Sequence, residues 1–261
     1  MYEFSREILS MQTNKMIRRE AKRRLLESGR FLSLAIGFAI SAVSVVVTMT
    51  LYQIVAMVML GFIPSEDAAY LVSLLALLLL FVFVAFPIII GYISVVYSVY
   101  KKEREVYIID IFKYFTSPKL YFSFALTSFF IVMRILLCYC LPLIVCGVLT
   151  SLLEGLALQY YVIFDIMIFA AVYLLMSLSL SKGYLALYYR IQGYGIRDAG
   201  RLSKVALRSH KGRTFAFKLG MLGLSILSLL TIATLFIYTA PLMAMAYFAY
   251  AEKMTENIIE L

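Results

Sequence analysis

Residues Ala68–Tyr100 read AAYLVSLLALLLLFVFVAFPIIIGYISVVYSVY, and the expected architecture follows from this stretch. It carries no charged side chain, and it is longer than the ~20 mainly apolar residues that a membrane-spanning helix needs. Its apolar residues do not alternate with polar ones as in a transmembrane strand, and open sheet edges cannot face lipid. The stretch therefore predicts a helix that crosses a bilayer.

Similar apolar stretches recur along the chain. They are Phe31–Ile63, Leu120–Leu153, Tyr160–Tyr189 and Thr214–Ala251. Hydrophobic residues make up 63% of the sequence, against about 45–50% in soluble domains. We expect an all-α, polytopic transmembrane helical bundle of five to six spans with short amphipathic cytoplasmic helices. The last stretch is either one long kinked helix or two spans near 215–231 and 236–252, and Pro87 and Pro142 predict kinks in their stretches.

Basic residues gather in alternate connections. Residues 1–30 hold eight Lys or Arg, residues 101–119 hold five and residues 182–218 hold nine, whereas residues 61–69 and 152–159 hold none. Basic loops stay on the cytoplasmic side of a membrane. We therefore expect a multi-pass protein of the cell (cytoplasmic) membrane with a cytoplasmic amino terminus.

The predicted spans divide one integral membrane domain, residues 1–261, into successive parts. These are a basic helix (1–30), a first hairpin (31–100), an amphipathic helix (101–118), a second hairpin (119–190), a basic amphipathic helix (191–213), and a last span or short hairpin (214–252). Gly91-Tyr92 and Gly183-Tyr184 recur at an offset of 92 residues. Either the hairpin unit is duplicated, or two unrelated hairpins share glycine and interfacial tyrosine.

The third basic connection predicts a helix with two unlike faces. Its cations follow one another in steps of four, three, four and three; they are Arg197, Arg201, Lys204, Arg208 and Lys211. The opposite face carries Ala199, Leu202, Val205 and Ala206. Such a helix can lie on a membrane with its cations toward anionic headgroups. The alternative is a plain connector whose charges only set topology, and nucleic acid is not an expected partner because topology accounts for the cations.

The middle connection predicts an apolar helical face. Its residues Ile108, Ile111, Phe112 and Phe115 are spaced i, i+3, i+4 and i+7, which is the spacing of one side of an α-helix.

Two charged residues lie inside predicted spans. Arg134 falls in the third stretch and Asp165 in the fourth. Charges at membrane depth are costly and tend to pair, so an intramembrane Arg134–Asp165 ion pair is one interpretation. The other is that either side chain extends toward the headgroups.

No set of residues predicts catalysis, a cofactor or a metal. Cys138, Cys140 and Cys146 share one apolar stretch without four converging ligands, and we interpret them as small packing residues. His210 has no evident acid or nucleophile partner. No phosphate-binding glycine pattern is present, so we do not expect an enzyme.

The carboxy-terminal third resembles bacterial integral membrane proteins of the family called domain of unknown function 975. The matching residues are Ser209, Lys211, Gly212, Phe215, Phe217, Pro241, Tyr247 and Tyr250. The basic amino-terminal segment that ends at Gly29 also fits the family. This chain departs from it at Thr231–Thr234, where a glycine turn is usual, and in having no Trp. The resemblance implies a bacterial membrane protein and carries over no catalytic residue.

These observations favour a non-enzymatic membrane protein that contacts anionic phospholipid headgroups. It would organise the membrane, or bind a membrane-protein partner or a second copy of itself. The alternative function is a transporter or permease subunit that uses the intramembrane polar residues.

Overall fold

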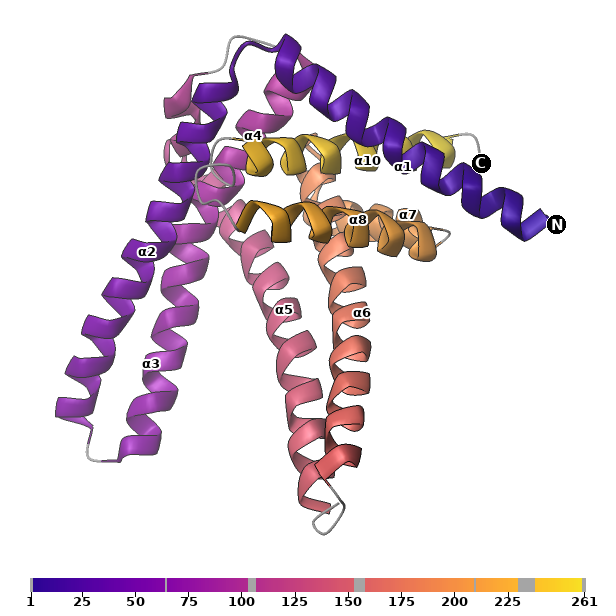
Figure 1. Ribbon diagram of the computed structural model, residues 1–261. Coiled ribbons are helices and arrows are strands. Elements are labelled where there is room, and N and C mark those ends of the chain that lie inside the picture. Colours follow the sequence, from indigo (N-terminus) through magenta and orange to yellow (C-terminus); the bar gives the residue numbers. More distant parts are fainter. Residues whose placement is uncertain are drawn as a thin grey trace. The chain divides into compact units, whose positions relative to one another are not determined.

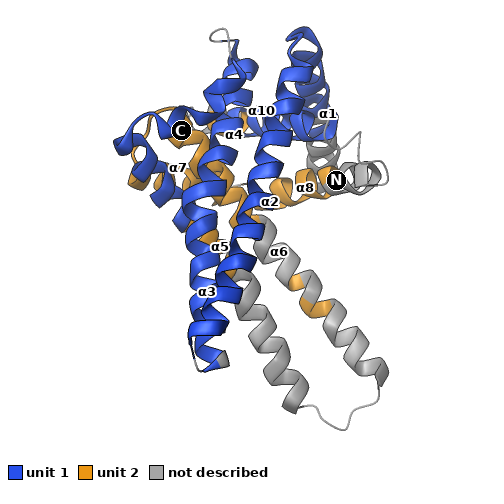
Figure 2. Cartoon of the chain, turned by 90° about the vertical axis from the view of Figure 1, so that its left-hand side faces the viewer, with its two compact units in different colours: residues 1–129, 222–252 blue, residues 130–221, 253–261 orange. Residues whose placement is uncertain are grey.

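The computed structural model describes residues 2–63, 65–102, 107–152, 158–208, 210–229 and 238–259. Every regular element within these ranges is a helix, so the all-α prediction is confirmed for the described part of the chain (Figure 1). The helices form two compact units (Figure 2). Unit 1 holds residues 1–129 and 222–252, and unit 2 holds residues 130–221 and 253–261.

Unit 1 begins with two long helices, α1 (Tyr2–Glu27) and α2 (Phe31–Phe62). The chain turns between them at Gly29, whose φ of +62° lies in the left-handed region that favours glycine. On α2 the buried residues follow one helical face, and they are Leu34, Ala35, Gly37, Ser41, Ser44 and Thr48. Small side chains on this face allow neighbouring helices to approach closely.

The stretch Ala68–Tyr100 lies in three joined elements, α3 (Glu66–Leu80), η1 (Phe81–Ala85) and α4 (Phe86–Lys101). Ser65 caps the start of α3 by accepting a hydrogen bond from the Ala68 backbone at 3.4 Å. Element η1 is a turn of π-helix that lies just before Pro87. The predicted interruption at Pro87 is therefore a π turn, which is a recognised way of placing proline in a helix.

Within the described residues, two helical segments are long and apolar enough to cross a membrane, Phe31–Phe62 and Asp67–Lys101. In the most apolar 18 residues of each segment, only 33% and 28% of the residues, respectively, are buried. A core helix of a soluble protein would be mostly buried, so this exposure favours a lipid environment. Membrane association is thus supported for one hairpin, whereas the count of five to six spans is not confirmed.

The middle connection folds differently from the prediction. It forms η2 (Ile108–Phe115), a 3₁₀ helix in which Ile111 and Tyr114 are buried and Phe112 and Phe115 are exposed. A 3₁₀ helix has three residues per turn, so side chains three apart share a face. The packed face is therefore Ile108, Ile111 and Tyr114, and the predicted α-helical face is wrong.

The last helix of unit 1 is α10 (Ala240–Ile259), of which residues up to 252 belong to this unit. It meets α4 through aromatic rings, with the Phe248 centroid 5.3 Å from that of Tyr97 and 6.2 Å from that of Tyr100. Edge-to-face and tilted rings at this separation attract one another beyond simple burial. The fifth apolar stretch, Thr214–Ala251, covers most of α8 (Lys211–Leu229) and the first part of α10, and residues 230–237 lie outside the described part.

Unit 2 contains the later part of α5 (Pro118–Leu152), then α6 (Leu158–Ile191), α7 (Ile196–Arg208) and the start of α8. Helix α6 ends in a turn at Gly193, whose φ is +97°. This turn returns the chain so that α7 packs against α6. Pro142 lies within α5, whose side chains at that level are outside the described residues.

The two halves of the proposed repeat pack differently. A Cβ atom on Gly91 would lie 1.8 Å from the backbone oxygen of Ile111, whereas a Cβ on Gly183 would be 3.6 Å from its nearest neighbour, Ile131. The first glycine is required by a close backbone approach and the second is not. Duplication of the hairpin stays a prediction.

Candidate functional site

The basic surface of α7 is the first candidate. All five predicted lipid-contact residues are exposed: Arg197, Arg201, Lys204, Arg208 and Lys211. Four of them lie on α7, and Lys211 lies in the first turn of α8 because α7 ends at Arg208. The name "basic face" is used below for Arg197, Arg201, Lys204 and Arg208.

The opposite side of α7 is packed. Its buried residues are Ala199, Ser203, Ala206 and Leu207, and α6 is the helix that it contacts. Val205, which the sequence places on the apolar side, is 51% exposed. Because the packed side already has a protein partner, the outward surface of α7 carries mainly cations, with Val205 as an exposed apolar residue.

Arg134 lies in unit 2 beside other cations. Its charge acts on Lys182 of α6, as does the charge of Lys204. Ile131 is level with Gly183, and this antiparallel register places Asp165 about four helical turns from the level of Arg134. The side chain of Asp165 lies outside the described residues, so the ion pair stays a prediction that this register does not favour.

Among the residues whose side chains are described, no three His, Cys, Asp or Glu side chains gather as metal ligands. Cys138, Cys140 and Cys146 fall outside those side chains. The Nδ1 atom of His210 lies 3.3 Å from the backbone oxygen of Ala206. His210 thus lies against the last turn of α7.

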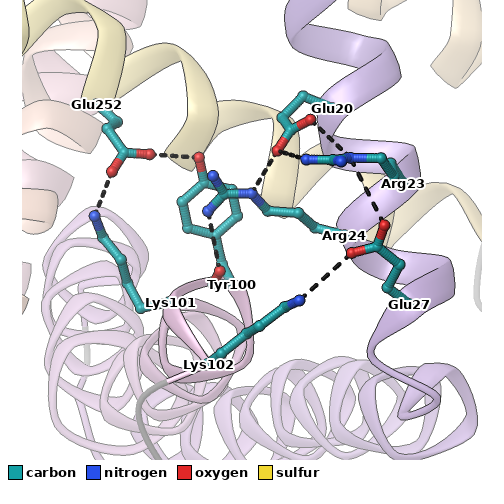
Figure 3. A network of polar contacts seen from close by, with 8 residues as sticks. All are labelled: Glu20, Arg23, Arg24, Glu27, Tyr100, Lys101, Lys102 and Glu252. Atoms are coloured by element: carbon teal, nitrogen blue, oxygen red, sulfur yellow. Dashed lines mark hydrogen bonds and ion pairs between the residues drawn. The ribbon is translucent and has the colours of Figure 1, made fainter.

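The second candidate is a polar cluster that joins three helices distant in sequence (Figure 3). The polar cluster consists of Glu20, Arg23, Arg24, Glu27, Tyr100, Lys101, Lys102 and Glu252. They come from α1, α4 and α10 of unit 1.

Tyr100 is the centre of the polar cluster. Its hydroxyl donates to Glu252 at 2.6 Å, and its backbone oxygen accepts from Arg24 at 3.2 Å. The Arg24 guanidinium also lies 4.2 Å from the centroid of the Tyr100 ring, a cation–π distance. Lys101 bonds the other carboxylate oxygen of Glu252, so one residue pair of α4 fixes both α1 and α10.

The electrostatics of the polar cluster favour ionised carboxylates. Burial opposes ionisation of Glu252, but hydrogen bonds from Lys101 and Tyr100, with the charges of Lys101 and Arg24, outweigh it and lower its pKa. Hydrogen bonds from Arg23 and Arg24 lower the pKa of Glu20 to about 2. Both carboxylates therefore stay charged at neutral pH, and the cluster balances part of the local positive charge.

The sequence indicated only part of this arrangement. In the sequence, topology accounts for the basic residues of α1 and α4, and no local pattern distinguishes Glu252. A signal was present, since Glu20, Arg23, Arg24 and Glu27 follow the spacing of neighbours on one helix. The pairing of Glu252 with Lys101, however, joins residues 151 positions apart.

Neither candidate contains a nucleophile aligned with a base, as a hydrolytic site requires. One presents exposed cations, and the other satisfies its own charges between helices. The first can bind an anionic surface, and the second holds helix ends together. Comparisons with protein-family models, with curated proteins and with solved structures find no match to this chain.

Proposed function

We propose that this protein is a non-enzymatic integral membrane protein that holds its α7 helix against an anionic phospholipid surface. The observation that carries the proposal is the basic face, four exposed cations on a helix whose other side is packed on α6. Cations near an anionic leaflet each contribute about 1 kcal/mol of attraction.

The charges of the connections between the apolar stretches set the orientation of the chain in the membrane. The basic connections lie in the cytoplasm with the amino terminus, where the inner leaflet carries anionic lipid. The long apolar helices α5 and α6 cross the bilayer as well, which makes the protein multi-pass. The protein organises lipid or holds a membrane-protein partner at the cytoplasmic leaflet.

The packed side of α7 determines the kind of lipid contact. An amphipathic helix that inserts its apolar side gains affinity from buried area, which added salt hardly weakens. Helix α7 has already packed most of that side on α6, so its contact with lipid is mainly electrostatic. It weakens with added salt because the Debye length shortens from about 10 Å at 0.1 M to about 3 Å at 1 M.

The test uses the full chain in bilayer discs that contain either anionic or zwitterionic phospholipid. The quadruple variant R197Q/R201Q/K204Q/R208Q removes the basic face. We expect the wild type to retain several more anionic lipids than the variant after detergent extraction, measured by native mass spectrometry. The difference should shrink in high salt and be absent with zwitterionic lipid.

A matched control separates the basic face from net charge. The variant K15Q/R18Q/R19Q/K22Q removes four exposed cations from α1 and leaves the same formal charge. It should retain nearly the wild-type complement of anionic lipid. Equal losses in both variants would show that net charge alone attracts lipid, and the proposal would fail.

The transport alternative depends on Arg134 and Asp165. The side chain of Asp165 lies outside the described residues, and no described contact joins it to Arg134. No described observation favours a substrate path, so transport is not proposed.

A further inference from the structure

The exposed apolar surface of the α3–α4 segment ends at one level. Large apolar side chains are exposed along α3 as far as Phe83, whereas every residue from Ile90 to Tyr100 is buried. At about 1.5 Å per residue the segment from Glu66 to Lys101 is about 52 Å long, well beyond the ~30 Å of a hydrocarbon core. The part that exposes apolar residues, Glu66 to Phe83, is about 26 Å long.

Aromatic rings gather at the level where this exposure ends. We name Phe83, Phe112, Phe115, Tyr121 and Phe122 the aromatic cluster. Tyr121 is its centre, with ring centroids 6.3 Å from Phe83, 5.4 Å from Phe115 and 5.4 Å from Phe122. Phe112 extends the cluster at 6.4 Å from Phe115.

A backbone bond holds the aromatic cluster in place. Pro87 has no N–H to donate to the carbonyl oxygen of Phe83, four residues earlier. The Tyr121 hydroxyl donates to that oxygen instead, at 2.6 Å. Because Pro87 does not use it, the Phe83 carbonyl oxygen accepts from Tyr121, and this bond fixes the start of α5 beside η1.

Helix η2 presents its other side outward. Ile109 is 75% exposed, and Phe112 and Phe115 are 40% and 43% exposed. The inward side is held by Ile111, which lies against Gly91 of α4. An exposed apolar side on a fixed helix that continues the exposed surface of α3 needs an apolar environment.

The nearby cation extends away from the aromatic cluster. The Lys113 ammonium bonds the Ser94 hydroxyl, about three turns of α4 beyond Phe83 in the direction of Lys101. Lysines at a membrane boundary direct the ammonium away from the hydrocarbon in this way, and aromatic rings favour the headgroup level.

We propose that the aromatic cluster lies at the bilayer boundary on the Lys101 side, with the outward face of η2 inserted among headgroups and upper acyl chains. The inference depends on the proposed membrane insertion of α2 and α3, and it is independent of the basic face. Residues Pro87–Lys101 then lie outside the hydrocarbon, and the polar cluster at their end lies in the aqueous layer.

Single tryptophans test the depth of each position, because the sequence contains no Trp. F112W and F115W probe η2, F122W probes α5, and L75W probes the middle of the Glu66–Phe83 segment. Each full-length variant is reconstituted with phospholipid brominated either near the glycerol or near the chain end, since bromine quenches nearby tryptophan. We expect the three cluster variants to be quenched several-fold more by the shallow label, and L75W several-fold more by the deep label.

The variants separate the inference from the proposed function. Suppose that the deep label still quenches L75W. The inference is then overturned if the cluster variants emit as in water, if neither label quenches them, or if the deep label quenches them more than the shallow one. L75W that the deep label does not quench would overturn membrane insertion itself. F122W keeps the test decisive if a change within η2 disturbs folding, because it lies on a different helix.

Discussion

Gly91 of α4 and Ile111 of η2 meet backbone to backbone. A Cβ atom on Gly91 would lie 1.8 Å from the Ile111 carbonyl oxygen and 2.7 Å from its carbonyl carbon. Real Cβ atoms do not approach so closely, and a backbone cannot move aside as a flexible side chain can. On the other side, a Cβ on Gly37 of α2 would lie 3.0 Å from the Tyr92 ring. Three elements of unit 1 therefore meet where two glycines allow it.

Substitution of Gly91 by Ala should separate η2 from α4. Overpacking of this kind costs about 1–3 kcal/mol in the free energy of unfolding, although Ala favours a helix by about 1 kcal/mol over Gly. We expect a lower thermal midpoint for G91A in detergent, followed by intrinsic fluorescence or circular dichroism. G183A is the matched control, since its Cβ would meet only ordinary contacts; a G91A midpoint equal to or above that of G183A would contradict the close approach.

Removal of the Tyr100 hydroxyl should weaken the junction of α4 with α10. Hydrogen bonds to charged groups contribute about 1.5–3 kcal/mol, and Glu252 accepts from Tyr100 and Lys101 together. Y100F and E252Q should each lower the free energy of unfolding, and the double variant should lose less than the sum. A double-mutant cycle measures this coupling, and strictly additive losses would show that the two side chains do not interact.

Glu20 should give stability a dependence on pH. Its pKa is lowered from 4.5 to about 2 in the folded chain by hydrogen bonds from Arg23 and Arg24. Because the folded pKa lies below the unfolded value, the stabilisation is complete above pH 4.5 and is lost as pH falls toward 2. The difference in unfolding midpoint between wild type and E20Q should narrow as the pH falls through that window. Added salt should also reduce it, since the Glu20–Arg23 pair is exposed. A difference that is constant with pH would contradict the assignment.

The packed face of α2 should reject a larger side chain. Thr48 is fully buried and donates to the Ser44 backbone oxygen at 2.8 Å, whereas its neighbour Met49 is 42% exposed. T48L should lower the unfolding midpoint because the added carbons have no space, and M49L should leave it nearly unchanged. Proteolysis in detergent gives a second measurement, and equal susceptibility of the two variants would argue against this packing.

Several features could be read directly from residue order. The uncharged stretch Ala68–Tyr100 predicted an apolar helical segment long enough to cross a membrane, because length and composition alone set that property. The steps of three and four between Arg197 and Arg208 determined the basic face, since helical periodicity alone sets which side chains share a side. These predictions depend only on local chemistry.

Other features required the tertiary structure. The sequence of Ile108–Phe115 fits an α-helix as well as a 3₁₀ helix, and the approach of Ile111 to Gly91 goes with the tighter form. Gly91 and Gly183 have the same Gly-Tyr context, yet only one is required by a neighbouring backbone. Glu252 carries no local sign of its contact with Lys101, because that contact exists only after α4 and α10 pack. The periodicity of a helix determines which of its side chains share a face. Which face of another element it contacts is determined only when distant parts of the chain pack together.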